Sequence, residues 1–159
     1  MSGVLTWRGH SWIALPARVY LAVVFLLACY FKILDPGAFA LDVATYQILP
    51  LSLINLQALI LPWVELLAGL MLLLGLRTRP AALLVSGMMV MFLVALTIAL
   101  AQGLDMGCGC FANEGGDDPI SWHTLVRDGI WLALSLYVLI FDRRPLGLDR
   151  LLERKTRES

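Results

Sequence analysis

Four long blocks of apolar residues constrain the fold of this chain more than any other feature. They cover about residues 15–34, 53–76, 80–102 and 121–141. A helix rises 1.5 Å per residue, so about 20 residues cross the roughly 30 Å of bilayer hydrocarbon. Backbone polar groups in lipid must find partners within their own segment, and a helix provides them. We therefore predict an all-α integral membrane protein, a four-helix bundle with the lipid bilayer as its solvent.

Composition supports the same class of protein. Of 159 residues, 60% are apolar and 15% are charged, whereas a soluble domain has about half apolar and a quarter charged residues. The formal net charge is zero, which argues against a nucleic-acid partner. We divide the chain into an N-terminal segment (1–14), one membrane domain (15–142) and a basic tail (143–159).

The distribution of basic residues predicts the orientation. Most basic residues lie around the start of the first block, between the second and third blocks, and after the fourth: Arg8, Arg18, Arg77, Arg79, Arg143, Arg144, Arg150, Arg154, Lys155 and Arg157. The connections 35–52 and 103–120 contain no lysine or arginine. Cytoplasmic loops are enriched in these residues, so we expect both termini in the cytoplasm of a bacterium and the 103–120 loop on the periplasmic or extracellular side of its inner membrane. Lys32 and Arg127 break the pattern, and we expect both to snorkel outward.

Two cysteines separated by one glycine, Cys108 and Cys110 in "DMGCGCF" (105–111), lie in that outward loop. Thiols on an oxidising face tend to pair, but a bridge across a single residue reaches ordinary disulfide geometry only with strain. Gly109 eases the turn because it has no Cβ. Strained, exposed disulfides exchange readily, so we interpret the pair as a redox couple and as the candidate catalytic residues.

Two other interpretations of this pair stay open, a fixed structural bridge and a metal site. A closed zinc site needs about four ligands, and even with His123 nearby the spacing fits no zinc pattern, so we assign no metal ligands. Two thiolates can also bind copper(I). Met88, Met89 and Met91 lie at successive helical positions, which predicts different faces rather than a joint copper site.

Cys29 is the third cysteine, in the outer part of the first block. "LLAC" (26–29) imitates a lipoprotein cleavage site, but the apolar block continues past it, so we expect the segment to be retained. A buried cysteine is usually a small apolar packing residue. The alternative is a relay thiol that exchanges with the loop pair.

Glu65 lies near the middle of the second block, where a carboxylate costs roughly 2.5–3.5 kcal/mol and normally finds a partner inside the bundle. We expect Arg127 to be that partner, with Lys32 as the second choice. A structural ion pair and a quinone-contacting acid are both consistent with this position. Trp63, close to Glu65 in sequence, is a candidate for lining a cavity beside it. Arg127 and His123 are further candidates for a relay or quinone-proximal role.

An ordered series of motifs resembles one family. The series is "KILDP" (32–36) followed by Phe39, "YQILP" (46–50), "LPWVELLAGLMLLLG" (61–75), "CGCF" (108–111) and "ISWHTLVRDGIWL" (120–132). It resembles the methylamine utilisation protein MauE family, within the DoxX-like group of four-helix membrane proteins. The chain departs from the family pattern at Ala112, where a glycine is common.

The resemblance implies a role in maturation of a periplasmic, disulfide-rich enzyme subunit beside a membrane-bound thioredoxin-like partner. The four-helix arrangement is also similar to that of quinone-linked, disulfide-forming membrane enzymes, which implies a quinone as the candidate cofactor. We therefore predict thiol–disulfide exchange through Cys108 and Cys110 with a thioredoxin-like protein or a disulfide-rich client. The alternatives are a non-catalytic assembly factor with a structural bridge and a copper-handling carrier.

Overall fold

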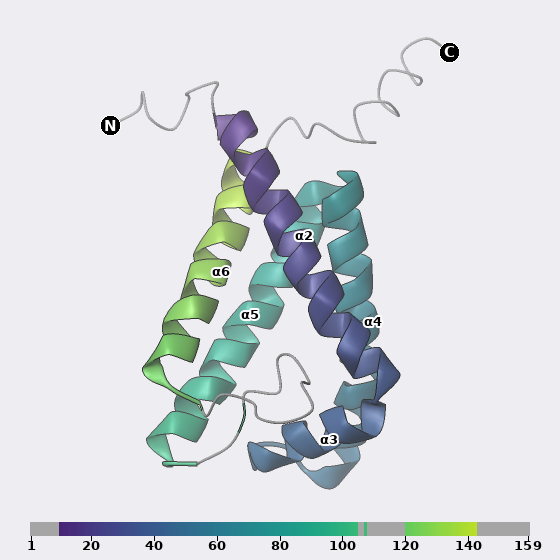
Figure 1. Cartoon of the computed structure of the whole chain (residues 1–159), viewed down its shortest axis with the longest axis vertical. Helices are drawn as coiled ribbons and strands as arrows, with labels where there is room; N and C mark the ends of the chain where they lie inside the picture. The colour runs from purple at the N-terminus through teal and green to yellow at the C-terminus, as the bar shows by residue number, and fades with distance from the viewer. Residues whose placement is uncertain (1–9, 105–106, 108–119, 143–159) are drawn as a thin grey trace.

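The computed structural model describes residues 10–104, 107 and 120–142 (Figure 1). Five α-helices make up most of this part: α2 (His10–Leu34), α3 (Pro36–Thr45), α4 (Leu51–Leu74), α5 (Thr78–Ala101) and α6 (Trp122–Phe141). All except α3 are long and apolar enough to cross a membrane. The predicted all-α class and the four spans are confirmed.

The short helix α3 was not predicted, because the sequence analysis treated 35–52 as a loop. Its first turn has strong local signals: the Asp35 side chain accepts a 2.9 Å hydrogen bond from the Ala38 N–H, and Pro36 occupies the first helical position. Phe39 and Val43 are buried against Ile54 of α4. At 10 residues, α3 is too short to span the bilayer, and it lies across one end of the bundle (Figure 1).

The predicted ends of the long helices shift by a few residues. Helix α4 stops at Leu74, two residues early, because Gly75 adopts a left-handed conformation (φ 66°) and its N–H bonds back to the last turn; glycine commonly ends helices in this way. Helix α2 begins at His10, five residues early, and continues through Pro16. His10 stacks on Phe141 of α6 with ring centroids 4.2 Å apart, a tertiary contact that local sequence does not reveal.

The four long helices form a closed ring, in which α2 contacts α4 and α6, and α5 contacts α4 and α6. Small residues allow α2 and α4 to approach closely, as is common between membrane helices. A Cβ at Gly69 would lie 3.0 Å from Leu26 Cγ and 3.4 Å from the Ala22 carbonyl oxygen. The main core includes Leu21, Ala22, Phe25, Ala68, Leu72, Ala81, Ala82, Val85, Met89, Trp131 and Val138.

Polar contacts hold α2, α5 and α6 together. Arg18 of α2 and Asp142, just after α6, form a buried ion pair at 3.2 Å. Between α5 and α6, the hydroxyls of Ser86 and Ser135 are 2.8 Å apart. The start of α2 and the end of α6 therefore lie at one end of the bundle. Helix α3, the end of α5 and the start of α6 lie at the other (Figure 1), and which side of the membrane each end faces stays a prediction.

Candidate functional site

A cavity of about 260 Å³ occupies the half of the bundle next to α3. Each of the five helices contributes to its wall, for example through Lys32, Phe39, Glu65, Phe92 and Trp131. On the four long helices, most of the lining residues come from the halves that adjoin α3, whereas much of the main core lies in the opposite half. The lining is mostly apolar and aromatic, with a few charged groups, a composition typical of small-molecule sites.

Lys32 of α2 and Glu65 of α4 form a buried ion pair in the cavity wall. Lys32 Nζ donates to Glu65 Oε1 at 2.7 Å, and the two side chains are 9% and 8% exposed. The ammonium group also lies 4.9 Å from the centre of the Phe39 ring. Two expectations are therefore wrong: Lys32 rather than Arg127 is the partner of Glu65, and Lys32 does not snorkel outward. A buried carboxylate within reach holds the ammonium inside the bundle.

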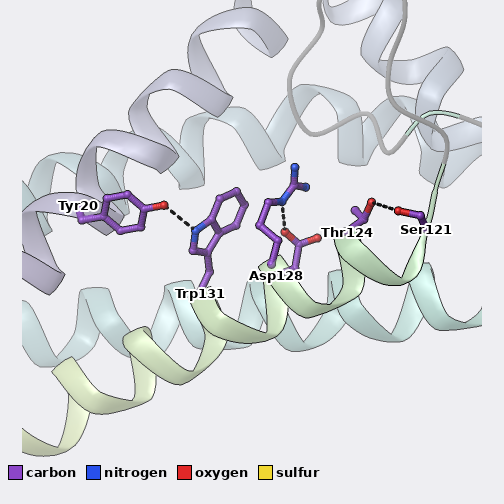
Figure 2. Close-up of polar contacts among 6 residues, drawn as sticks. Tyr20, Ser121, Thr124, Asp128 and Trp131 are labelled. Carbon is purple, nitrogen blue, oxygen red and sulfur yellow. Dashed lines mark hydrogen bonds and ion pairs between the residues drawn. The ribbon is translucent and has the colours of Figure 1, made fainter.

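Arg127 pairs instead with its sequence neighbour Asp128 on α6. Arg127 Nε donates to Asp128 Oδ1 at 3.1 Å, and the guanidinium lies 4.8 Å from the centre of the Trp131 ring. The indole N–H of Trp131 donates to the Tyr20 hydroxyl of α2 at 3.2 Å (Figure 2). This row of contacts links α6 to α2, and two of its members, Asp128 and Trp131, line the cavity.

Asp128 is a site residue that the sequence analysis missed. It is fully buried and lines the cavity. The available signal was its place in the middle of the "HTLVRDGIWL" stretch, because an ionisable residue inside a membrane span is a candidate functional residue by default. The adjacent Arg127 was the residue predicted to face the interior, but its side chain is 40% exposed and the Asp128 side chain is the buried one.

Each of the two buried carboxylates in the cavity wall keeps one oxygen without a hydrogen-bond partner among the described residues. These atoms are Glu65 Oε2 and Asp128 Oδ2, and both residues line the same cavity. Buried polar atoms are nearly always hydrogen-bonded, so an unpartnered one needs an explanation. Two unpartnered acceptor atoms on residues that line one cavity make this cavity the best candidate for a ligand site in the part of the chain that the structure describes.

Cys29 lies in α2 close to the ion pair but does not line the cavity. It is buried and unpaired, and its thiol donates to the Leu26 carbonyl oxygen at 3.2 Å. Lys32 follows three residues later, so the two side chains share one side of the helix. The predicted relay role stays a prediction, and the thiol has no exposed surface on which to meet a protein partner directly.

Other predicted residues lie apart from the cavity or outside the described residues. Trp63 is 58% exposed on the outer side of α4 and does not line the cavity. His123 is exposed near the start of α6. Cys108 and Cys110 fall outside the described residues, and they belong to the segment that joins α5 to α6. Only four peptide units separate Cys108 from Leu104, a stretch that reaches at most about 14 Å.

The structure also bears on metal binding. Met88, Met89 and Met91 all border the cavity from neighbouring faces of α5. Met89 is buried whereas Met91 is 51% exposed, which agrees with the prediction that they face different directions. In residues 10–104, 107 and 120–142, no group of three His, Cys, Asp or Glu side chains is placed to hold a metal ion.

Together, the fold and the cavity define a multi-pass membrane protein with buried ion pairs in its helical bundle and a mostly apolar cavity beside α3. The chain belongs to the methylamine utilisation protein MauE family, whose family model matches residues 10–141. No solved structure gave a significant match.

Three curated relatives are called methylamine utilization protein MauE. The chain is 31% identical to that of Paracoccus denitrificans over 76% of its length, and 34% identical to that of Methylorubrum extorquens over 77%. The relative from Methylophilus methylotrophus is 28% identical over 86% of the chain. The chain spans 65% of the length of the first two relatives and 73% of the third.

Proposed function

We propose that this protein is the membrane component of a thiol–disulfide exchange system, with Cys108 and Cys110 as its redox pair. The process it serves is methylamine utilisation, as the names of the relatives suggest. The partner is a thioredoxin-like protein or a disulfide-rich client on the periplasmic side, and the bundle holds the exchanging segment at the surface of the inner membrane.

The exchange proceeds through two displacements at sulfur. The thiolate of one loop cysteine attacks a partner disulfide, which forms a mixed disulfide and releases one partner sulfur as a thiolate. The second loop cysteine then attacks the mixed disulfide and releases the other partner sulfur. Two electrons pass from the Cys108–Cys110 dithiol to the partner disulfide, and the two thiol protons end on the partner thiols or in water. The reverse sequence oxidises a partner dithiol.

The observation that supports this proposal most is the arrangement of the α3 end of the bundle. Helix α5 ends and α6 begins there, so both ends of the connection that carries the loop cysteines lie at the end of the bundle that holds the cavity and the buried Lys32–Glu65 pair. A fixed structural bridge by itself explains no buried ionic groups or cavity. A quinone that serves the exchange would use the inner side of Glu65, since Trp63 faces outward.

Single-cysteine variants test the proposal by trapping the intermediate. Cys108→Ser and Cys110→Ser each remove one sulfur, so the variant that keeps the attacking thiol cannot resolve its mixed disulfide. We expect one of the two to accumulate a covalent adduct with a thioredoxin-fold protein whose own second active-site cysteine is replaced and whose first is supplied as a mixed disulfide with thionitrobenzoate. The attacking loop thiolate then displaces thionitrobenzoate as the leaving thiolate and stays joined to the partner sulfur. The adduct is measured by non-reducing electrophoresis and is lost on reduction. If neither variant forms it, the exchange proposal is wrong.

A further inference from the structure

The cavity contains two buried carboxylate oxygens that accept no hydrogen bond. Glu65 is 6% exposed and Asp128 is fully buried, and each directs one oxygen to no partner among the described residues. A buried charged acceptor that makes no hydrogen bond keeps its full desolvation penalty. A ligand that donates hydrogen bonds to both oxygens would remove this cost, since neither oxygen has a donor among the described residues.

The charges of the two carboxylates are already matched. Lys32 pairs with Glu65 at 2.7 Å, and Arg127 pairs with Asp128 at 3.1 Å. The same cations lie on the faces of the Phe39 and Trp131 rings, the positions that a cationic ligand would use. The free oxygens therefore need a neutral donor rather than a third positive charge.

A hydroxyl group fits these requirements better than a carbonyl group. A hydroxyl donates one hydrogen bond and accepts others, so it can bond to a carboxylate oxygen and accept from a remaining N–H of Lys32 at the same time. A carbonyl only accepts and leaves both carboxylate oxygens unpartnered. Two such oxygens on two helices favour a ligand with more than one hydroxyl.

The rest of the cavity is suited to an apolar body. Phe39, Leu61, Phe92 and Trp131 contribute aromatic and aliphatic surface to a volume of about 260 Å³. An apolar cavity of about 150 Å³ accepts benzene, so this one accommodates a substituted ring or part of an acyl chain. The surrounding helices are the candidate membrane spans, so the bilayer is the natural source of such a molecule.

We propose that the cavity binds a neutral, hydroxyl-bearing amphiphile from the bilayer. Its hydroxyls donate to Glu65 and Asp128, and its apolar body packs between the α3 aromatic residue and those of α5 and α6. Two membrane molecules share this chemistry: a hydroquinone with an apolar tail and a glycerol-headed lipid. Binding does not depend on the exchange reaction, so the failure of either proposal leaves the other intact.

The test uses the full chain in phosphatidylcholine nanodiscs, because the phosphatidylcholine headgroup has no hydroxyl. Decyl hydroquinone, kept reduced, and monooleoylglycerol are titrated separately, and the rise in melting temperature gives an apparent Kd for each. We expect saturable binding of at least one probe. Saturation by the first identifies a redox-active lipophile as the ligand type, and saturation by the second identifies a lipid. The absence of saturable binding by both would overturn the proposal.

A matched ligand and matched variants separate cavity binding from partition into lipid. The dimethyl ether of the hydroquinone, or of the glycerol head, has the same body without donors, and we expect it to bind at least about tenfold more weakly, a difference of about 1.4 kcal/mol. Ala95→Phe fills the cavity, and Asp128→Asn turns the free acceptor into a donor; both are expected to weaken binding by a similar factor. Ala133→Phe, on the exposed side of α6, keeps the wild-type Kd.

Some outcomes of this comparison would contradict the proposal even if a variant fails to fold. Equal binding of the ether and the hydroxyl form by the wild-type protein would show that the carboxylates play no part. Unchanged binding by a folded Ala95→Phe variant would place the ligand outside the cavity.

Discussion

Replacing Cys108 and Cys110 together by serine is expected to abolish thiol–disulfide exchange with a thioredoxin-like partner. Serine keeps the size and polarity of the side chain but cannot form a disulfide, so neither displacement can occur. The rate of exchange in proteoliposomes should fall to that of protein-free vesicles. It is measured by alkylating partner thiols at timed intervals and quantifying the alkylated products by mass spectrometry. This is the largest effect expected from any change in the chain.

A matched control distinguishes loss of the sulfurs from disturbance of the segment. Met106→Ser combined with Ala112→Ser introduces the same number of serines on either side of the pair and keeps both cysteines, so exchange should persist. Full exchange by the Cys108→Ser, Cys110→Ser protein would contradict the mechanism. Normal maturation of the client in cells that carry only the Cys108→Ser, Cys110→Ser variant would favour a non-catalytic assembly factor.

Replacing Glu65 alone by leucine is expected to lower the free energy of unfolding by about 3–5 kcal/mol. The change leaves the Lys32 ammonium buried without its partner, and an uncompensated buried charge is strongly destabilising. Replacing Lys32 and Glu65 together by leucine should recover most of this loss, because two apolar side chains of similar size can substitute for a buried ion pair. Lys32→Leu is therefore expected to restore stability when it is added to Glu65→Leu.

Unfolding in mixed micelles, with increasing fractions of a denaturing detergent, measures this comparison. The wild type, the two single variants and the double variant form a thermodynamic cycle, whose coupling term isolates the pair. If the losses of the single variants simply add in the double variant, the 2.7 Å contact contributes no coupling and the ion pair is not a structural unit of the cavity wall.

Much of the fold was predictable because the bilayer imposes a length and a polarity on every spanning segment. The four long helices follow from blocks of about 20 apolar residues. Helix α3 was missed because its residues were assigned to a connection by elimination, although Asp35 and Pro36 form a recognisable helix start. The beginning of α2 depends on the contact of His10 with Phe141, far away in sequence, so local pattern could not give it.

The sequence predicted several residues of the candidate site but not which cation pairs with Glu65. Glu65 stood out as a carboxylate inside a span, but the choice between Lys32 and Arg127 depends on how the helices rotate and cross. That rotation is set by packing, including the close approach of α2 and α4 at Gly69, and sequence alone does not specify it. Asp128 was hidden by the same limit, because helical position alone does not say which side chain faces a cavity.

The central claim is that Cys108 and Cys110 form a redox pair on the outer face of the membrane. Intact cells are treated with a membrane-impermeant reductant and then with an impermeant maleimide, and the label on each cysteine is measured by mass spectrometry. The account predicts that Cys108 and Cys110 are labelled before lysis, and only after reduction, while buried Cys29 is not. Labelling of the pair only after the cells are opened would place the segment in the cytoplasm and contradict the account.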